Sequence, residues 1–365
     1  MPPHSSDSRT SIDQAGLSKA GDPGSSGRSQ QPVEAFSEQP GDRGEIPALS
    51  FRERELQDRN FVGADLQGAD FSAAKLTRVD FSQAKLAGAC LTGATLEGCR
   101  FREADLQRAR LDEAVALSCD FRGAQLGQSC FDGSDLSRSD FSAADLRRAS
   151  LSGVNLFQAR LVRSQLVGGV LSGSNLAEAL LVAADLSESN LVNARLSRAT
   201  AARAVFRKAD LERADFLLAD LSEADFTEAH APLVRFQRAC LSRCVFRGLR
   251  APDADFEFAE LTQSRFENAQ LDRAVFVGAI LGGGKAVDCS LRQADFFWTD
   301  LGTFIMERCA TDGVRFPSAT AAVHRPAGAP PPVVTPVPLH RIALSAAERA
   351  RLLGESSKAG GIKRD

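Results

Sequence analysis

The residues that could bind a metal ion or take part in catalysis are scattered along this sequence. Its four histidines fall far apart, at His4, His230, His324 and His340. Its eight cysteines include no CxxC pair and lie at positions 90, 99, 119, 130, 240, 244, 289 and 309. Zinc sites and hydrolytic centres need such residues clustered, so we expect no metal, no cofactor and no enzyme activity. The cysteines are expected to be free thiols in a reducing compartment.

A large apolar residue recurs at every fifth position through most of the chain. The first of these sites is Phe51 and the last is Phe316, which makes 54 sites in phase, and Leu or Phe fills 47 of them. A small residue, usually Ala, stands two places before each site. A five-residue step moves about 140° around an α-helix and reaches the opposite face of a strand, so neither element can bury this pattern. The remaining sites hold Ala116, Ala201, Ala231, Ala251, Ala286, Met306 and Thr311.

Self-similarity over this length predicts a repeat architecture, in which each unit buries its apolar side chains only by stacking on its neighbours. A five-residue unit that turns the chain by about 90° closes a square after four units, or roughly 20 residues. Phenylalanines spaced by twenty support this number, because they would stack into ladders. One series runs from Phe61 to Phe141, a second from Phe216 to Phe316 and a third from Phe206 to Phe266.

These residues resemble the pentapeptide-repeat family, whose repeat reads A(D/N)LXX. The segments ADLQGADF (64–71), SDLSRSDFSAADL (134–146) and ADLERADFLLADLSEADF (209–226) match this pattern closely. The resemblance covers residues 51–316 and implies an all-β fold, a right-handed quadrilateral parallel β-helix of about 13 coils. With coils about 4.8 Å apart, the rod would be roughly 65 Å long.

The N-terminal part departs from the pattern. Residues 1–46 are rich in Ser, Gly, Gln and Pro, which predicts a disordered tail. Arg54 and Arg59 then occupy inward positions that elsewhere hold Ala, while Ser50 and Glu53 have the spacing of a capping box. We therefore expect residues 47–58 to be irregular or helical and to cap the β-helix, with regular coils from about Phe61. The β-helix with its cap would span residues 47–316.

The C-terminal part departs as well. Phe304 fills a small-residue position, and Gly282–Gly284 predicts a loosened turn. Residues 317–365 are expected to form a Pro-rich linker, PAGAPPPVVTPVP at 326–338, and a short helical tail. The helix would begin at Ser345, with Glu348 completing a capping box, and would end at Gly354. It would either cap the last coil or remain free.

Aspartate often stands immediately before the large apolar residue, and two interpretations are open. An acidic stripe could imitate DNA, as the resemblance to gyrase-protecting family members implies. Alternatively, these carboxylates accept hydrogen bonds from the backbone in each turn. Residues 51–316 hold 33 Lys and Arg against 37 Asp and Glu, a weak field that favours the second interpretation. The aspartates include Asp65, Asp70, Asp80, Asp105, Asp140, Asp145, Asp220, Asp225, Asp295 and Asp300.

Apolar residues at outward positions predict an interaction surface. On the wall of the second phenylalanine series they are interrupted by Gln237, Arg238 and Glu257. Such a stripe on a soluble rod is typical of a contact surface, for an end-to-end dimer through the last coils or for a partner protein. The alternative is that the C-terminal tail folds back and covers it. The six residues of this apolar stripe are Leu217, Leu218, Phe258, Val277, Phe297 and Trp298.

Two smaller features complete the outward and inward patterns. Cys99 and Cys119, twenty residues apart, would stack on adjacent coils at a spacing compatible with a disulfide, although we expect each to replace a buried Ala as a free thiol. A second aliphatic group is too small to argue from and comprises Val162, Val167, Val170, Leu180, Val182 and Val192.

The sequence therefore predicts a non-catalytic scaffold or adaptor that binds an unidentified protein. The alternatives are a DNA-mimicking binder of gyrase and a bacterial secretion-system effector or accessory protein. Direct binding of nucleic acid is not expected, because no basic groove with stacking aromatics is visible. No apolar run approaches the roughly 18 residues of a membrane span, and the N-terminus lacks the apolar core of a signal peptide. We expect a cytoplasmic protein, with secretion by a route independent of a signal peptide left open.

Overall fold

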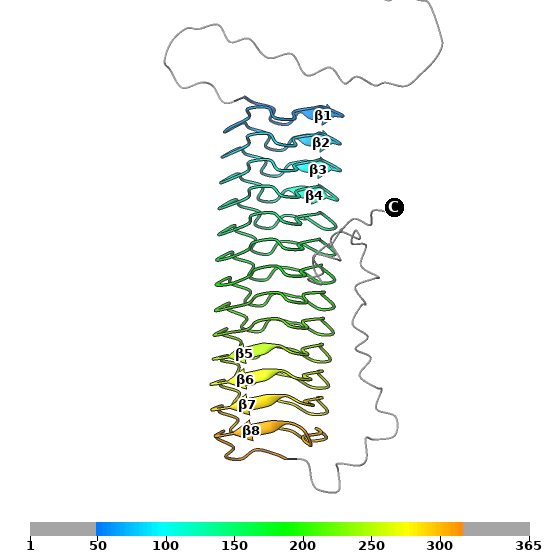
Figure 1. Cartoon of the computed structure of the whole chain (residues 1–365). Coiled ribbons are helices and arrows are strands. Elements are labelled where there is room, and N and C mark those ends of the chain that lie inside the picture. The colour runs from blue at the N-terminus through cyan, green and yellow to red at the C-terminus, as the bar shows by residue number, and fades with distance from the viewer. Residues whose placement is uncertain (1–48, 317–365) are drawn as a thin grey trace, which may run out of the picture. The chain divides into compact units, whose positions relative to one another are not determined.

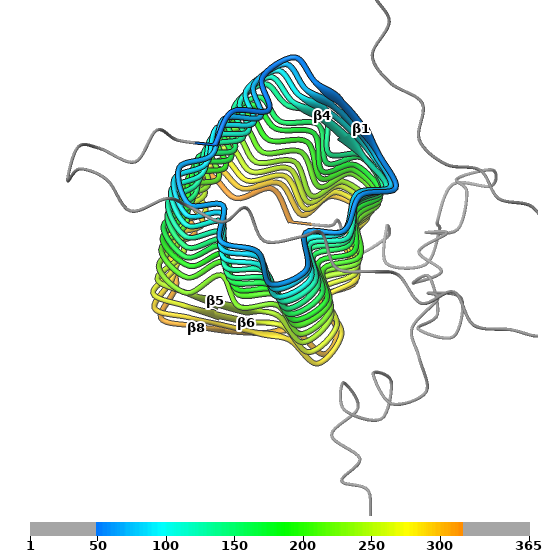
Figure 2. The same ribbon diagram turned by 90° about the horizontal axis from the view of Figure 1, so that it is seen from above.

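Residues 49–316, the part of the chain that the computed structural model describes, wind into a right-handed parallel β-solenoid of about 13 coils (Figures 1 and 2). The view along its axis shows a coil with four sides, as the five-residue pattern predicted. Each side is built from the large apolar residues, here called centres, that recur every twenty residues. Wall A carries centres 51 to 311, wall B 56 to 316, wall C 61 to 301 and wall D 66 to 306. No helix occurs among residues 49–316.

Tight turns at the corners make the square. The carbonyl of a centre accepts a hydrogen bond from the residue three places on, as in Ala64 N to Phe61 O at 3.0 Å. The second residue after the centre, the +2 position, lies in the left-handed region, for example Gly63 with φ of 68°. Many +2 positions hold Arg, Glu or Gln with φ near 55–60°, such as Arg108 with φ of 58°. This conformation costs an L-residue about 1–2 kcal/mol, so neighbouring coils must stabilise it.

Hydrogen bonds between successive coils supply that stabilisation. Phe51 N donates to Asp70 O at 2.7 Å, and Asp70 N donates to Leu49 O at 2.9 Å. The same exchange recurs at every wall, so that residues twenty apart pair in parallel. The backbone polar groups of inner coils are thereby satisfied without any helix.

Two short parallel sheets form where a wall is flatter. The first lies on wall B near the N-terminal end, and its order is β1 (Glu55–Gln57), β2 (Lys75–Thr77), β3 (Thr95–Glu97), β4 (Val115–Leu117). The second lies on wall D, across the axis, in the order β5 (Val245–Arg247), β6 (Arg265–Glu267), β7 (Lys285–Val287), β8 (Ile305–Glu307). Strands pair in register with a shift of twenty residues, for example Leu56 with Leu76.

The core consists of the centres and of the small residues two places before them. Phenylalanines stack along each predicted series: the ring centroids of Phe101 and Phe121 are 4.7 Å apart, and those of Phe216 and Phe236 are 5.1 Å apart. Series on opposite walls meet edge to face, as in Phe216 and Phe226 at 6.3 Å. Both geometries are favourable for aromatic rings. The phenylalanines of walls B and D therefore pack against each other at the axis of the rod.

The expected N-terminal cap is wrong. Residues 50–58 already form a regular coil, in which β1 pairs with β2 and Ser50 bridges to Asp70. Arg54 and Arg59 do occupy inward positions, yet both are exposed, because no earlier coil among the described residues lies above them. At the first coil an inward side chain can turn toward the open end, which removes the need for an irregular segment.

The predicted loosening at Gly282–Gly284 is also wrong. Gly284 N donates to Leu281 O at 2.9 Å, as in other turns, and Gly283 has the usual positive φ of 69°. A Cβ on Gly284 would lie 3.2 Å from the ring of Phe304 in the next coil. The missing side chain therefore makes room for Phe304, which explains both departures from the pattern together. The predicted tails, residues 1–46 and 317–365 with the helix from Ser345 to Gly354, lie outside the described residues.

Candidate interaction surface

The six residues of the apolar stripe all lie on wall B, at outward positions of the C-terminal coils. They fall on the first (+1) or second (+2) residue after the centres at 216, 256, 276 and 296. Trp298 is exposed by 42%, whereas the other five side chains are half-buried. The structure therefore places the stripe on one wall, as expected, but does not make it continuous.

The coil with Gln237 and Arg238 separates Leu217 and Leu218 from the remainder. Gln237 Nε2 donates to Glu257 Oε2 at 3.4 Å, which keeps polar groups along this edge. Arg238 reaches toward the next coil, where its guanidinium carbon lies 5.8 Å from the ring centroid of Phe258. We therefore distinguish the two leucines from a compact group formed by Phe258, Val277, Phe297 and Trp298.

Phe258 lies flat along the wall because the next coil has a glycine below it. A Cβ on Gly278 would come within 2.6 Å of two carbons of the Phe258 ring, closer than any real contact. Gly278 also has φ of 66°, a conformation that glycine adopts without strain. Gly278 therefore adopts the positive φ that the turn needs, and its missing side chain leaves room for the ring of Phe258 against the rod.

The last coil of the stripe presents two aromatic rings together. The ring centroids of Phe297 and Trp298 are 4.7 Å apart and tilted by 31°. Arg315 places its guanidinium 4.4 Å from the centroid of Phe297 and pairs with Asp295, with an N to O distance of 3.2 Å. An exposed indole beside a fixed arginine is the combination that dominates many protein interfaces.

The aspartates before the centres act mainly in turns. Asp70 Oδ1 accepts from Ser72 N at 2.9 Å and from Ser72 Oγ at 2.5 Å, and these bonds lower the pKa of Asp70. The same bond to the residue two places on recurs at Asp80, Asp140 and Asp225. The carboxylates thus satisfy backbone N–H groups, which agrees with the second of the two interpretations.

Many acidic side chains are also paired with arginine from a neighbouring coil. Asp253 accepts from Arg273 Nε at 2.7 Å, and Asp288 accepts from Arg308 Nε at 2.6 Å. Each arginine lowers the pKa of its aspartate. Because Asp and Arg twenty residues apart lie on neighbouring coils, these pairs alternate in charge along the wall. They do not form a continuous acidic face.

Four buried cysteines, Cys99, Cys119, Cys244 and Cys289, occupy small inward positions and are free, whereas the buried Cys240 lies immediately before a centre. Cys99 Sγ donates to Leu76 O at 3.2 Å and Cys119 Sγ to Leu96 O at 3.4 Å, in each case the carbonyl of a centre in the previous coil. Burial raises the pKa of Cys289 to about 11. These thiols are structural, and residues 49–316 contain no group of three His, Cys, Asp or Glu side chains able to hold a metal ion.

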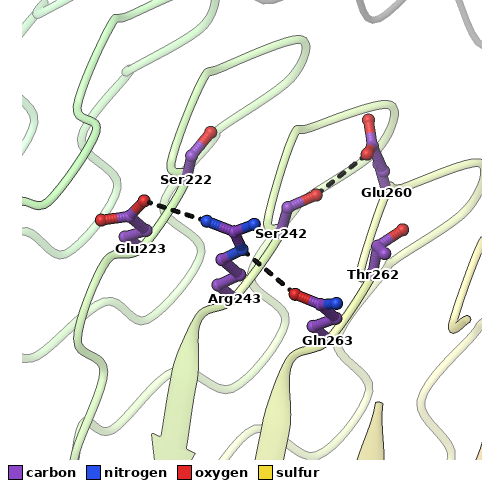
Figure 3. A pocket seen from close by; sticks show the side chains of 7 residues that line it. All are labelled: Ser222, Glu223, Ser242, Arg243, Glu260, Thr262 and Gln263. Atoms are coloured by element: carbon purple, nitrogen blue, oxygen red, sulfur yellow. Dashed lines mark hydrogen bonds and ion pairs between the residues drawn. The ribbon is translucent and has the colours of Figure 1, made fainter. Parts of the chain in front are cut away.

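A shallow polar depression of about 300 Å³ lies on wall C (Figure 3). Arg243 lies between Glu223 and Gln263 and donates from Nε to Gln263 Oε1 at 3.1 Å. Ser242 Oγ donates to Glu260 Oε1 at 2.9 Å. His230, the single histidine among residues 49–316, belongs to wall A, so the serine has no imidazole base beside it. The depression has the chemistry of a hydrated surface rather than of an acyl-transfer site. Ser222 and Thr262 complete its lining.

The repeated coils match a known family. A family model described as pentapeptide repeats matches residues 55–173, 179–216, 219–248 and 252–285, more than half of the chain. The chain belongs to the pentapeptide-repeat family. No curated protein matches it.

Several solved structures of pentapeptide-repeat proteins are similar to this one. HetL, a protein involved in heterocyst differentiation regulation from the cyanobacterium Nostoc sp. strain PCC 7120, is 30% identical, with 58% of this chain and 89% of that chain covered and a TM-score of 0.34. QnrB1, a plasmid-mediated fluoroquinolone resistance protein, is 20% identical, with coverages of 48% and 85% and a TM-score of 0.25. A thylakoid-lumen protein from Arabidopsis thaliana is 30% identical, with coverages of 38% and 71% and a TM-score of 0.13.

Some surface features of this pentapeptide-repeat protein were missed from the sequence. Arg315 and Gly278 complete the aromatic group, and both could have been found by reading the residue twenty places from Asp295 and from Phe258. The second aliphatic group does not form one patch. Val162, Leu180 and Val182 lie on wall C, Val167 lies on wall D, and Val170 and Val192 lie on wall A. Among residues 49–316, no helix is long and apolar enough to cross a membrane.

Proposed function

We propose that the protein is a non-catalytic interaction scaffold, and that the aromatic group Phe258, Val277, Phe297 and Trp298 on wall B is its contact surface. The single observation that carries this proposal is the exposed Trp298 packed on Phe297, with Arg315 fixed above Phe297. Apolar side chains held at outward positions contribute little to the solenoid core. Their burial by a partner would therefore be a net gain in stability.

We favour a second copy of this chain as the first partner to test. Wall B carries the aromatic group in the last described coils, where Phe316 is also half exposed. Two copies meeting through these coils would bury both apolar features at one symmetric interface.

The test compares molecular mass by light scattering in the full chain and in a variant with Phe258→Glu and Trp298→Glu. A dimer that becomes a monomer supports the proposal. The matched control is Val115→Glu with Leu117→Glu, two exposed apolar residues on the same wall in β4, which should leave the mass unchanged. If the full chain and both variants are all monomeric, self-association is wrong. The scaffold proposal then fails if the aromatic variant also retains every partner that the full chain crosslinks in its own cell extract.

DNA mimicry of the kind that targets gyrase is a weaker proposal for this chain. Its aspartates are bonded to turns and paired with arginines, as at Asp253 and Arg273, and the charges of the rod nearly balance. A supercoiling assay with purified gyrase separates the two functions, because a DNA mimic would inhibit supercoiling, whereas a scaffold for another protein would not. The free thiols are compatible with a cytoplasmic location, because thiols stay reduced there. No observation favours an effector role.

A further inference from the structure

Two cysteines lie opposite each other in neighbouring coils at the C-terminal end of the described residues. Cys289 and Cys309 both stand two places before a wall A centre, at the small inward position. On one side of the pair, Ala310 N donates to Cys289 O at 2.9 Å. On the other side, Asp288 N donates to Glu307 O at 3.0 Å. The two Cα atoms are therefore one coil spacing apart, about 4.8 Å, within the roughly 4.4–6.8 Å found in disulfides.

The two thiols differ in their access to solvent. Cys309 is half-buried, whereas Cys289 is exposed by only 3%. Burial raises the pKa of Cys289 to about 11, so this thiol is almost fully protonated at neutral pH. An oxidant from solvent therefore reaches Cys309 first and finds Cys289 directly behind it. Redox-active pairs have this arrangement, in which an accessible cysteine reacts and a second cysteine resolves the product.

We propose that Cys289 and Cys309, besides filling inward positions, are a site of reversible oxidation at which a disulfide joins the last two described coils. The oxidant is a low-molecular-weight disulfide such as oxidised glutathione. Cys309 Sγ loses its proton, attacks one glutathione sulfur and releases the other glutathione as a thiolate. Cys289 Sγ then loses its proton, attacks Cys309 Sγ and releases the second glutathione. The pair gives up two electrons and two protons, its S–S bond forms, and glutathione disulfide is reduced to two thiols.

A second cysteine pair with the same spacing provides an internal comparison. Cys99 and Cys119 also lie in register on adjacent coils, between the paired residues of β3 and β4 and the bridge that follows them. Their exposed fractions are 0% and 1%, so an oxidant in solvent has no access to either sulfur. The coil of Cys119 is also held on its far side, where Cys119 N donates to Ser139 Oγ at 2.9 Å.

This difference matters because a disulfide draws the two coils together. Stacked Cβ atoms lie about 4.8 Å apart, whereas a disulfide needs roughly 3.5–4.5 Å, so one coil must move by at least a few tenths of an ångström. Within residues 49–316, the coil of Cys309 pairs with one neighbouring coil only. It can therefore move toward Cys289 without breaking hydrogen bonds to a further described coil, as Cys119 would have to do.

The disulfide would enclose the part of the rod that carries Phe297 and Trp298. Joining residues twenty apart reduces the entropy of the unfolded chain and so stabilises the folded coil between them. Trp298 lies inside the closed loop, so its fluorescence reports this stabilisation. Any effect on the binding of a partner rests on the proposed function, whereas the disulfide and its effect on stability do not.

Peptide mapping tests the bond directly. The full chain is incubated with oxidised glutathione at mildly alkaline pH, the remaining thiols are blocked with iodoacetamide, and the protein is digested with trypsin. The two cysteines then fall in separate peptides, 286–292 and 309–315. We expect these peptides to be recovered mainly as one linked pair, with Cys99 and Cys119 recovered as blocked thiols. Recovery of Cys289 and Cys309 as thiols or as separate glutathione adducts would overturn the proposal, and so would a Cys309 to Cys309 link between two chains.

The urea midpoint of Trp298 fluorescence gives an independent measurement. In the full chain, oxidation should raise this midpoint by about 1 M, as expected for a closed loop of this length, and dithiothreitol should reverse the shift. Cys309→Ser should abolish the shift, whereas the matched variant Cys119→Ala should retain it. The dichroism spectra of both reduced variants check that they fold. A shift that persists in Cys309→Ser would belong to other thiols, and a full chain whose midpoint does not respond to oxidation would contradict the stabilising role of the bond.

Discussion

Serine and cysteine at the small inward positions form hydrogen bonds that alanine cannot make. Ser139 Oγ donates to Ala116 O at 2.7 Å and accepts from Cys119 N at 2.9 Å, so one hydroxyl satisfies two backbone groups next to β4. Ser174 Oγ, at an equivalent inward position, is buried without a hydrogen-bond partner among the described residues. The same residue type is therefore stabilising at one position and costly at another.

We expect Ser139→Ala to lower the free energy of unfolding by about 1–3 kcal/mol, because it leaves two buried backbone groups unsatisfied. Ser129→Ala is the control, since the carbonyl that Ser129 Oγ contacts, Leu126 O, also accepts from Ser129 N. Urea denaturation followed by dichroism measures both. Equal losses in the two variants would contradict the role of the hydroxyl at Ser139.

The glycine beneath Phe258 gives a second prediction. Gly278→Ala should destabilise the protein by about 1–2 kcal/mol from its positive φ, and further because the new methyl group displaces the ring. Gly93→Ala has a similar φ and no atom within 4 Å, so it isolates the backbone cost. Urea titration of the two variants measures the difference, and a Gly278→Ala loss no larger than that of Gly93→Ala would show that the ring moves freely.

Each wall is a stack of equivalent positions, twenty residues apart in the sequence, rather than one long strand or helix. Coils contact only their neighbours, so stability is approximately a sum of local terms along the rod. Trp298 is the sole tryptophan and lies on wall B near the C-terminal end of the described residues. Its fluorescence therefore reports the unfolding of those coils in particular.

Two buried phenylalanines test this locality. Phe276 stacks between neighbours at 4.8 and 4.7 Å, and Phe101 stacks between neighbours at 5.0 and 4.7 Å. Either change to Ala should cost about 3–5 kcal/mol near the substitution. We expect Phe276→Ala to lower the urea midpoint of Trp298 fluorescence more than Phe101→Ala does. Identical midpoints would mean that the rod unfolds as one cooperative unit.

The walls and ladders could be predicted from the sequence because the five-residue period is unbroken, so that one assumption about the turn places every centre. The first coil could not, since the rule against buried charge at Arg54 and Arg59 holds only where another coil lies above. The gap between Leu218 and Phe258 follows from Gln237 and Arg238, which the sequence did indicate.

Across the whole solenoid, opposite charges alternate between coils and reduce the net field. Asp70, Asp145, Asp253 and Asp288 all have lowered pKa values, from hydrogen bonds to Ser72, Arg147, Arg273 and Arg308 respectively. A carboxylate whose pKa is lower in the folded protein than in the unfolded chain stabilises the fold at pH values above the unfolded pKa. This contribution disappears as the pH falls through the folded value.

Stability should therefore be constant between about pH 5 and 7 and should decrease below about pH 4, the region of the unfolded aspartate pKa. Urea midpoints measured from pH 2 to 7 check the direction. Asp253→Asn with Asp288→Asn should make the acid loss smaller, because two of the linked groups no longer titrate. A midpoint that rises on acidification would contradict the role assigned to these pairs.

The exposed arginines of the first coil make the two ends of the rod unequal. Arg54 and Arg59 lie where an added coil would place alanine, so a second rod stacked head to tail on this end would bury two positive charges in the interface. Backbone groups at a solenoid end otherwise invite the next chain to continue the ladder, and repetition of that step yields a filament. We expect these two cations to disfavour such head-to-tail stacking.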